Sequence, residues 1–167
     1  MDEAVIIAIG GNLAFEGLPV QAVLEAAAAR LDRAGLRPLA RSRWWRSAAW
    51  PDPTRPAFLN GVALVATTLG PRETMAALQR IEAEFGRRRG EANAPRTLDL
   101  DLIAYGRRII DEPGLVVPHP RAADRLFVMG PLAELAPRWR HPVSGETAAD
   151  LAERADVGTD AVPIDGS

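Results

Sequence analysis

The sequence contains neither cysteine nor lysine among its 167 residues. Without cysteine, the protein can form no disulfide, no thiolate metal site and no cysteine nucleophile. Because all 20 basic residues are arginines, no lysine can act as a base, a Schiff-base former or a phosphate ligand. Any phosphate group must therefore be held by arginine, by backbone N–H groups or by a metal ion.

The sequence also lacks a long apolar run and a strong excess of charge. No apolar run approaches the ~20 residues that a membrane-spanning helix needs, and the acidic start, Met1-Asp2-Glu3, does not resemble a signal peptide. The formal net charge of -2 argues against a nonspecific nucleic-acid binder. We therefore expect a cytoplasmic, monomeric protein with no nucleic-acid or membrane partner.

The length suits one domain, residues 1–167, with a proper core. Apolar periodicity predicts strands over residues 5–9, 36–46, 58–68 and 97–105, and helices over residues 19–31, 71–85, 132–135 and 148–154. A Gly-Gly-Asn sequence at residues 10–12 indicates a turn, and the proline-rich residues 47–57 an exposed, partly mobile loop. Residues 155–167 are polar, and we expect a loosely ordered tail there.

The strand predicted over residues 97–105 carries two aspartates on one face. Asp99 and Asp101 alternate with leucines that suit a core. Two carboxylates roughly 6.5–7 Å apart along a strand repel each other, so they need a cation between them or a shared proton. Mg²⁺ prefers oxygen ligands and keeps positions for water and phosphate. The pair by itself fits a metal site and an ordinary solvated face about equally.

Arginines lie close to this pair in the sequence. Arg87, Arg88 and Arg89 precede the strand, and Arg96 comes directly before it. Acids that bind metal beside guanidinium groups that bind phosphate are what phosphoryl transfer requires. A run of three arginines is more often only a solvated loop, but its place beside the acidic pair favours phosphate binding.

Two further polar residues have two interpretations each. Asn60 lies beside Phe58 on one face of a predicted strand, where its amide could pair with a planar heterocycle or with local backbone. His119 lies between two prolines that fix its backbone, which suits a rigid site loop or a structural surface histidine.

Five segments in order make the chain resemble a known family. They are IAIGGNL, FLNGVALVATT, QRIEAEFGRRR, APRTLDLDLIAYG and VPHPRAADRLFVMGPL, which together run from about Val5 to about Leu135. This series resembles 6-hydroxymethyl-7,8-dihydropterin pyrophosphokinases, enzymes of folate biosynthesis. The resemblance implies an α+β, ferredoxin-like domain with a central, mostly antiparallel sheet and helices on its faces. It also implies transfer of pyrophosphate from ATP to the pterin hydroxymethyl group, which leaves AMP.

The resemblance also implies roles for individual residues. Two Mg²⁺ ions are expected, with Asp99 and Asp101 as ligands, and Arg87 and Arg96 join these acids as catalytic positions. The positions on the ATP side are Gln79, Glu82, Arg87, Arg89, Arg96, His119 and Arg125. The positions on the pterin side are Ser47, Ala48, Trp50, Phe58, Asn60 and Phe127. Of these, Phe58 and Phe127 would stack on the ring and Asn60 would bind its edge.

The chain departs from the family pattern at two places. Residues 91–94 read Glu-Ala-Asn-Ala, where many relatives have an Arg-Trp-Gly run, and Trp50 replaces a smaller aliphatic residue. Two other functions also fit the residues: a different Mg²⁺-dependent nucleotidyl or phosphoryl transferase, and an RNA-binding module that grips phosphates with residues 87–89. The net acidity disfavours the second of these.

Overall fold

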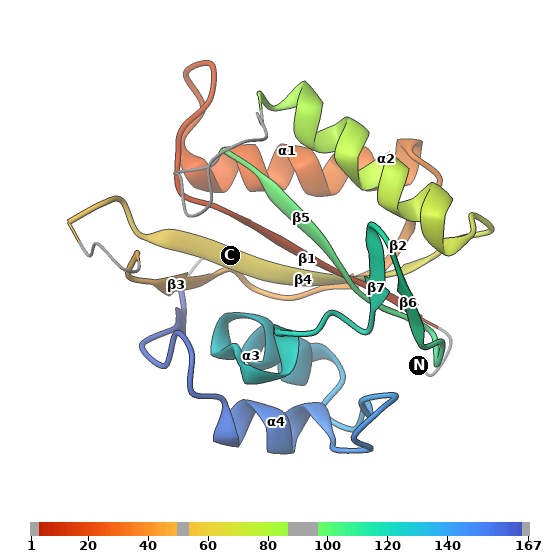
Figure 1. Ribbon diagram of the computed structural model, residues 1–167. Helices are drawn as coiled ribbons and strands as arrows, with labels where there is room; N and C mark the ends of the chain where they lie inside the picture. The colour runs from red at the N-terminus through yellow and green to blue at the C-terminus, as the bar shows by residue number, and fades with distance from the viewer. Residues whose placement is uncertain (1–3, 50–53, 87–96, 165–167) are drawn as a thin grey trace.

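The computed structural model describes residues 4–49, 54–86 and 97–164, which fold around a six-stranded antiparallel sheet (Figure 1). Its strands are β1 (Val5–Gly11), β2 (Arg37–Arg41), β3 (Trp45–Ser47), β4 (Phe58–Ala66), β5 (Asp99–Tyr105) and β8 (Val162–Pro163). A separate hairpin pairs β6 (Ile110–Glu112) with β7 (Leu115–Val117). The helices are α1 (Val20–Arg33), α2 (Pro71–Glu84), α3 (Leu126–Leu135) and α4 (Ala148–Arg154).

The sheet runs in the order β5-β1-β4-β3-β8, and β2 pairs with β4 beside β3. This order, with α1 and α2 as the connections from β1 to β2 and from β4 to β5, is compatible with the expected ferredoxin-like arrangement. The predicted α+β class is confirmed. Among the described residues, no helix has the length and apolar character needed to cross a membrane.

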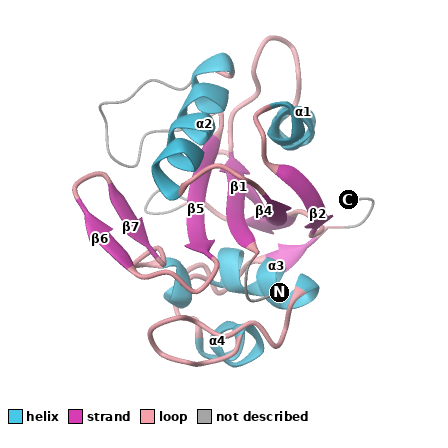
Figure 2. Ribbon diagram, turned by 90° about the vertical axis from the view of Figure 1, so that its right-hand side faces the viewer, coloured by secondary structure: helices cyan, strands magenta, loops and turns pink. Residues whose placement is uncertain are grey.

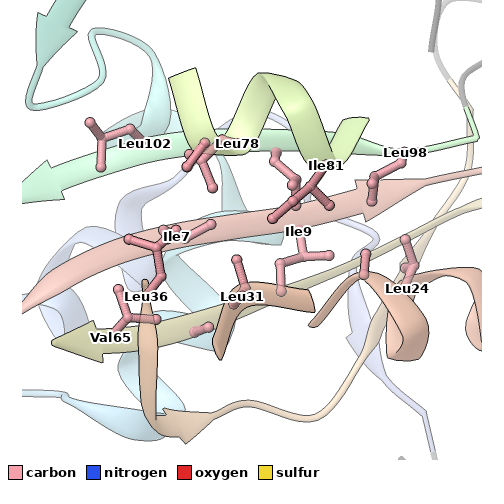
Figure 3. Packing of buried hydrophobic residues seen from close by; sticks show 14 of the residues in the cluster. Ile7, Ile9, Leu24, Leu31, Leu36, Val65, Leu78, Ile81, Leu98 and Leu102 are labelled. Carbon is pink, nitrogen blue, oxygen red and sulfur yellow. The ribbon is translucent and has the colours of Figure 1, made fainter. Parts of the chain in front are cut away.

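The sheet separates two hydrophobic cores (Figures 1 and 2). On one face, α1 and α2 pack on alternate residues of β1, β4 and β5, and Figure 3 shows Leu78 and Ile81 of α2 near Leu98 and Leu102. On the other face, α3 and α4 pack on the remaining alternate residues, such as Ile6 and Val62. All seven residues of β1 are buried because helices cover both faces of this central strand.

The alternation predicted for β5 is confirmed. Leu98, Leu100 and Leu102 belong to the core under α1 and α2. Farther along, Ile103 and Ala104 both belong to the core under α3, because a β-bulge between Leu102 and Ala104 shifts the register against β1. The faces assigned to the leucines and the aspartates in the sequence are therefore correct.

Three predictions for the elements need correction. The turn predicted at residues 10–12 is wrong for Gly10 and Gly11, which continue β1. Gly10 pairs with both β4 and β5, and Gly11 pairs with β4. The strand predicted over residues 36–46 is two strands, because Ser42 bonds to both polar groups of the Val62 backbone and Trp44 is fully buried on the α1 side. The helix predicted at residues 132–135 begins earlier, at Leu126. Pro131 lies inside it and lacks an N–H to donate, but the loss of this one hydrogen bond does not end the helix.

The loosely ordered tail expected after Ala155 is also corrected for the residues that the structure describes. Val162 and Pro163 form β8, which pairs with Arg46 and Trp45 of β3. Ala161 beside them is buried. The sequence did not predict this strand, because residues 155–167 are mostly polar and only a few apolar residues hold the strand in place.

A buried leucine and an exposed leucine together give a test of the core. Leu78 is fully buried, whereas Leu39 is 51% exposed. We expect Leu78→Ala to lower the free energy of unfolding by about 2–5 kcal/mol, because it removes buried contacts and leaves a cavity. The matched variant Leu39→Ala should cost less than about 1 kcal/mol. Urea denaturation of both variants measures the difference, and equal losses would contradict the assignment of the core.

Candidate functional site

One row of residues crosses four strands on the face that α3 covers. Gly10 of β1 lies opposite Asn60 of β4 on one side and opposite Asp99 of β5 on the other. Asn60 in turn lies opposite Trp45 of β3. Directly paired residues point to the same face of a sheet, so the row Asp99, Gly10, Asn60 and Trp45 lies on one face. With strands about 4.8 Å apart, the backbones of Asp99 and Asn60 are about 10 Å apart.

Gly10 leaves room in the middle of this row for the side chain of Asn60. A Cβ at Gly10 would lie only 2.2 Å from Oδ1 of Asn60, so the amide of Asn60 already occupies the space above the glycine. Asp101, two residues along β5, lies opposite Ala8. Both aspartates thus lie opposite the two smallest residues of β1 on that face, Gly10 and Ala8.

Helix α3 crosses this row. At its start, the charge of Arg125 lowers the pKa of His119 and the charge of Asp99 in β5 raises it, so both charges act on this histidine. Farther along the helix, a Cβ at Gly130 would lie 2.7 Å from the ring of Trp45 in β3. The helix therefore runs from the β5 side to the β3 side, and Phe127 lies between these two contacts. Its ring has the Arg125 guanidinium 5.6 Å from the ring centroid.

Phe58 and Ser47 extend the same face at the end of the sheet. They are opposite each other in the pairing of β4 with β3, and Phe58 is two residues before Asn60, so all three share a face. Ser47 is buried, Ala48 is exposed, and Phe58 is half-buried. The ring of Phe58 and the amide of Asn60 thus share one face of the sheet, which is an arrangement that suits a flat, polar ligand.

His119 is held by its backbone and by one ring nitrogen. Its N–H donates to the carbonyl of Ile103 in β5 at 2.8 Å, and its Nδ1 accepts the N–H of Arg121 at 3.2 Å. Burial, together with the charges of Arg125 and Arg121, lowers the pKa of His119 below its usual 6.5, although Asp99 opposes the shift. At pH 7 the ring is therefore neutral, and Nε2 carries the proton that it can donate to a ligand.

Glu82 reaches the acidic strand from α2. It is only 5% exposed, and its carboxylate accepts the N–H of Leu100 at 2.8 Å. Leu100 separates Asp99 from Asp101, and β5 is an edge strand of the sheet. Glu82 therefore fixes the peptide between the two aspartates, a role that its sequence position could not reveal. Gln79, one helical turn earlier, is exposed.

Four of the predicted site residues lie outside the described residues. They are Trp50, Arg87, Arg89 and Arg96. Within the described ranges, no group of three or more acidic or histidine side chains could hold a metal ion. A pair of aspartates still fits Mg²⁺, because this ion is commonly held by one or two carboxylates and takes its other oxygen ligands from phosphates and water.

The fold and this face define a class of protein: an α+β protein whose sheet presents paired carboxylates next to an amide flanked by aromatic rings. Comparison of the sequence with known protein families identifies the family within this class. The family model for 7,8-dihydro-6-hydroxymethylpterin-pyrophosphokinase (HPPK) matches residues 6–137. This chain therefore belongs to the HPPK family, and the resemblance noted from the sequence is confirmed.

Curated relatives agree with the family model. The chain is 42% identical over 152 residues to the 2-amino-4-hydroxy-6-hydroxymethyldihydropteridine pyrophosphokinase of Synechocystis sp., covering 90% of this chain and 75% of the relative. It is also 42% identical over 142 residues to the protein of the same name from Pseudomonas aeruginosa, covering 85% of this chain and 86% of that one.

A solved structure supports the fold. The wild-type HPPK-DHPS of Plasmodium falciparum with pteroate matches with a TM-score of 0.69 at 12% identity. The match covers 90% of this chain but only 44% of that longer chain. At this identity the likeness concerns the fold alone.

The contact between Glu82 and Leu100 predicts a local change in β5. We expect Glu82→Ala to leave the Leu100 N–H without its acceptor, which should lower the free energy of unfolding by about 1–3 kcal/mol and speed amide exchange at Leu100. Glu82→Gln keeps an acceptor oxygen and should retain most of the protection. Hydrogen exchange followed by NMR tests this, and unchanged protection of Leu100 in Glu82→Ala would rule out the proposed contact.

Proposed function

We propose that this protein transfers the pyrophosphoryl group of ATP to the hydroxymethyl group of 6-hydroxymethyl-7,8-dihydropterin in folate biosynthesis, releasing AMP. Membership of the HPPK family supports the reaction. The observation that carries it for this chain is the row of Asp99, Gly10 and Asn60. This row brings a carboxylate suited to a metal-bound phosphate next to an amide suited to a pterin edge.

The pterin is assigned to the Asn60 side of the row. The amide of Asn60 offers both a donor and an acceptor, which matches the alternating donors and acceptors of a pterin edge. Phe58 shares the Asn60 face of β4, and Phe127 comes from α3, which packs on that face; in this proposal the two rings stack on opposite faces of the pterin. Ser47 and Ala48, with Trp50, would line the end of this pocket.

The triphosphate is assigned to the Asp99 side. Asp99 and Asp101 would hold Mg²⁺, of which two ions are expected, and the bound metal would neutralise charge on the phosphate oxygens. His119 offers its Nε2 proton to a phosphate oxygen, and Arg125 offers a cation beside it. Arg87, Arg89 and Arg96 supply the remaining positive charge in this proposal. Gln79 and Glu82 on α2 complete the nucleotide side.

In the proposed reaction, the pterin hydroxyl oxygen bonds to the β-phosphorus while the bond from that phosphorus to the α–β bridging oxygen breaks. AMP leaves with that oxygen, and the proton of the pterin hydroxyl group passes to water. The protein contributes alignment and charge balance more than covalent chemistry. The row fits this demand because the acceptor and donor sites are separated by only one residue without a side chain.

An activity assay tests the proposed function directly. The protein is incubated with ATP, Mg²⁺ and 6-hydroxymethyl-7,8-dihydropterin, and the nucleotides and pterins are separated by chromatography. We expect AMP and the pterin pyrophosphate in equal amounts. Formation of ADP, or the absence of both products, would contradict the proposal.

The aspartate pair gives a second prediction. Asp99→Asn and Asp101→Asn should each lower kcat at least about 100-fold, because each removes a charged metal ligand and the phosphate charge is then poorly balanced. Both variants should remain folded, which circular dichroism can verify. Wild-type turnover in either folded variant would remove the metal assignment, and chelation of divalent ions should stop the wild-type reaction.

Gly10 and Asn60 predict a coupled effect on pterin binding. Gly10→Ala should displace the Asn60 amide and raise the KM for the pterin about as much as Asn60→Ala does, with little change in the KM for ATP. In the double variant the new methyl group meets no amide, so the two effects should not add. Steady-state kinetics of the three variants measure the coupling, and simple additivity would show that the amide does not lie over Gly10.

The expectations of a cytoplasmic and monomeric protein stay predictions. Light scattering after size-exclusion chromatography can test the second, with a mass near the 18.0 kDa of one chain expected.

A further inference from the structure

The C-terminal residues 156–164 connect two parts of the proposed pterin pocket. The family match ends at residue 137, so these residues lie beyond the part that the family model describes. From α4 the chain passes the start of α3 and then reaches β3, which it joins as β8 (Figure 1). Phe127 belongs to the first of these places, and Ser47 and Ala48 belong to the second.

At the start of α3, this segment lies against Phe127. The Leu126 N–H donates to the Val157 carbonyl at 2.9 Å, and the Val157 N–H donates to the Asp124 carbonyl at 3.0 Å. Next to them, a Cβ at Gly158 would lie 2.5 Å from Cδ2 of Phe127. The φ of Gly158 is +66°, which glycine adopts most easily. The Phe127 ring thus rests directly on the Gly158 backbone.

At β3, the same segment holds the backbone just past the end of the strand. The carboxylate of Asp160 accepts the Ala48 N–H at 2.8 Å. Val162 and Pro163 pair with Arg46 and Trp45, and the Ile164 N–H donates to the Trp44 carbonyl at 3.0 Å. The contact of Asp160 comes after the last residue of β3, so the pairing of β8 alone does not fix Ala48.

We propose that the segment 156–164 positions the two sides of the pterin pocket, with Gly158 setting the plane of Phe127 and Asp160 setting the Ser47–Ala48 backbone. This inference rests on the proposed function of the same site. Asp160 acts through Ala48 and is a positioning residue. It is exposed, so its removal deletes one hydrogen bond and little packing.

The contact of Asp160 predicts an effect on the pterin and not on the nucleotide. Asp160 bonds to the backbone just past the end of β3, whereas the proposed metal ligands Asp99 and Asp101 lie on β5 at the other side of the sheet. A change at Asp160 should therefore alter the KM for the pterin and leave the KM for ATP within about twofold. A loss of general stability would alter both constants together.

Three single variants test this role. Asp160→Ala removes the acceptor, and we expect the KM for the pterin to rise about five- to tenfold, a factor in the range of the net contribution of one solvent-exposed hydrogen bond. Asp160→Asn keeps an acceptor oxygen and should restore a KM close to that of the wild type. Thr147→Ala is the matched control, because Thr147 also accepts one backbone N–H, from Asp150 at 3.1 Å, but at the remote start of α4. Both KM values of this control should equal those of the wild type.

Gly158→Ala tests the second contact independently. The added methyl group should displace the Phe127 ring, shift its proton NMR signals and raise the KM for the pterin. Unshifted ring signals with an unchanged KM would overturn the role of Gly158.

The outcomes separate the two proposals. Wild-type protein that forms no pterin pyrophosphate would overturn the proposed function and this inference with it. An active wild type whose Asp160→Ala variant keeps its pterin KM, or raises both KM values equally, would overturn the positioning role alone.

Discussion

The antiparallel register of three strands is the constraint on which the site depends. With Gly10 opposite both Asn60 and Asp99, groups that are almost 40 residues apart in the sequence are brought to either side of one glycine. A shift by one residue in either pairing would turn every side chain of the shifted strand to the other face. The aspartates would then enter the leucine-lined core, where unpaired carboxylates are costly. The apolar core under α1 and α2 therefore enforces the register that the chemistry requires.

The two faces of the sheet differ in their roles: one supplies most of the packing, and the other also carries the candidate site. The face under α1 and α2 is apolar along its whole length and supplies most of the packing. The opposite face is apolar only under α3 and α4, where Ile6, Val62 and Leu64 are buried. Polar residues take over the same alternate positions near the end of β1, and α3 crosses at that boundary with Phe127. The candidate site residues can thus project from rigid strands without interrupting either core.

The sequence predicted best those features that depend on a short repeat. The period of two in β5 placed Asp99 and Asp101 opposite the leucines, and the structure confirms it. Gly10 was missed because a Gly-Gly-Asn sequence usually forms a turn, and only the contact with Asn60 reveals why glycine continues the strand. Asp160 and Gly158 were missed for a similar reason, since their partners are more than 30 residues away and no periodicity records such contacts.

The two histidines show why a local sequence pattern does not identify a site. Each precedes a proline, and in each the Nδ1 accepts the N–H of the residue after that proline. Proline has no N–H, so this is the first donor available. The geometry is therefore a property of the His-Pro sequence. What distinguishes His119 is its position beside Asp99 and Arg125, which only the folded chain provides.

The most direct test is a crystal structure of the protein with Mn²⁺, a non-hydrolysable ATP analogue and the pterin, because manganese can be located by its anomalous scattering. We expect an anomalous peak within about 2.3 Å of a carboxylate oxygen of both Asp99 and Asp101, with the pterin edge bonded to the Asn60 amide. Manganese bound away from both aspartates, or a pterin outside the reach of Asn60, would contradict the central claim.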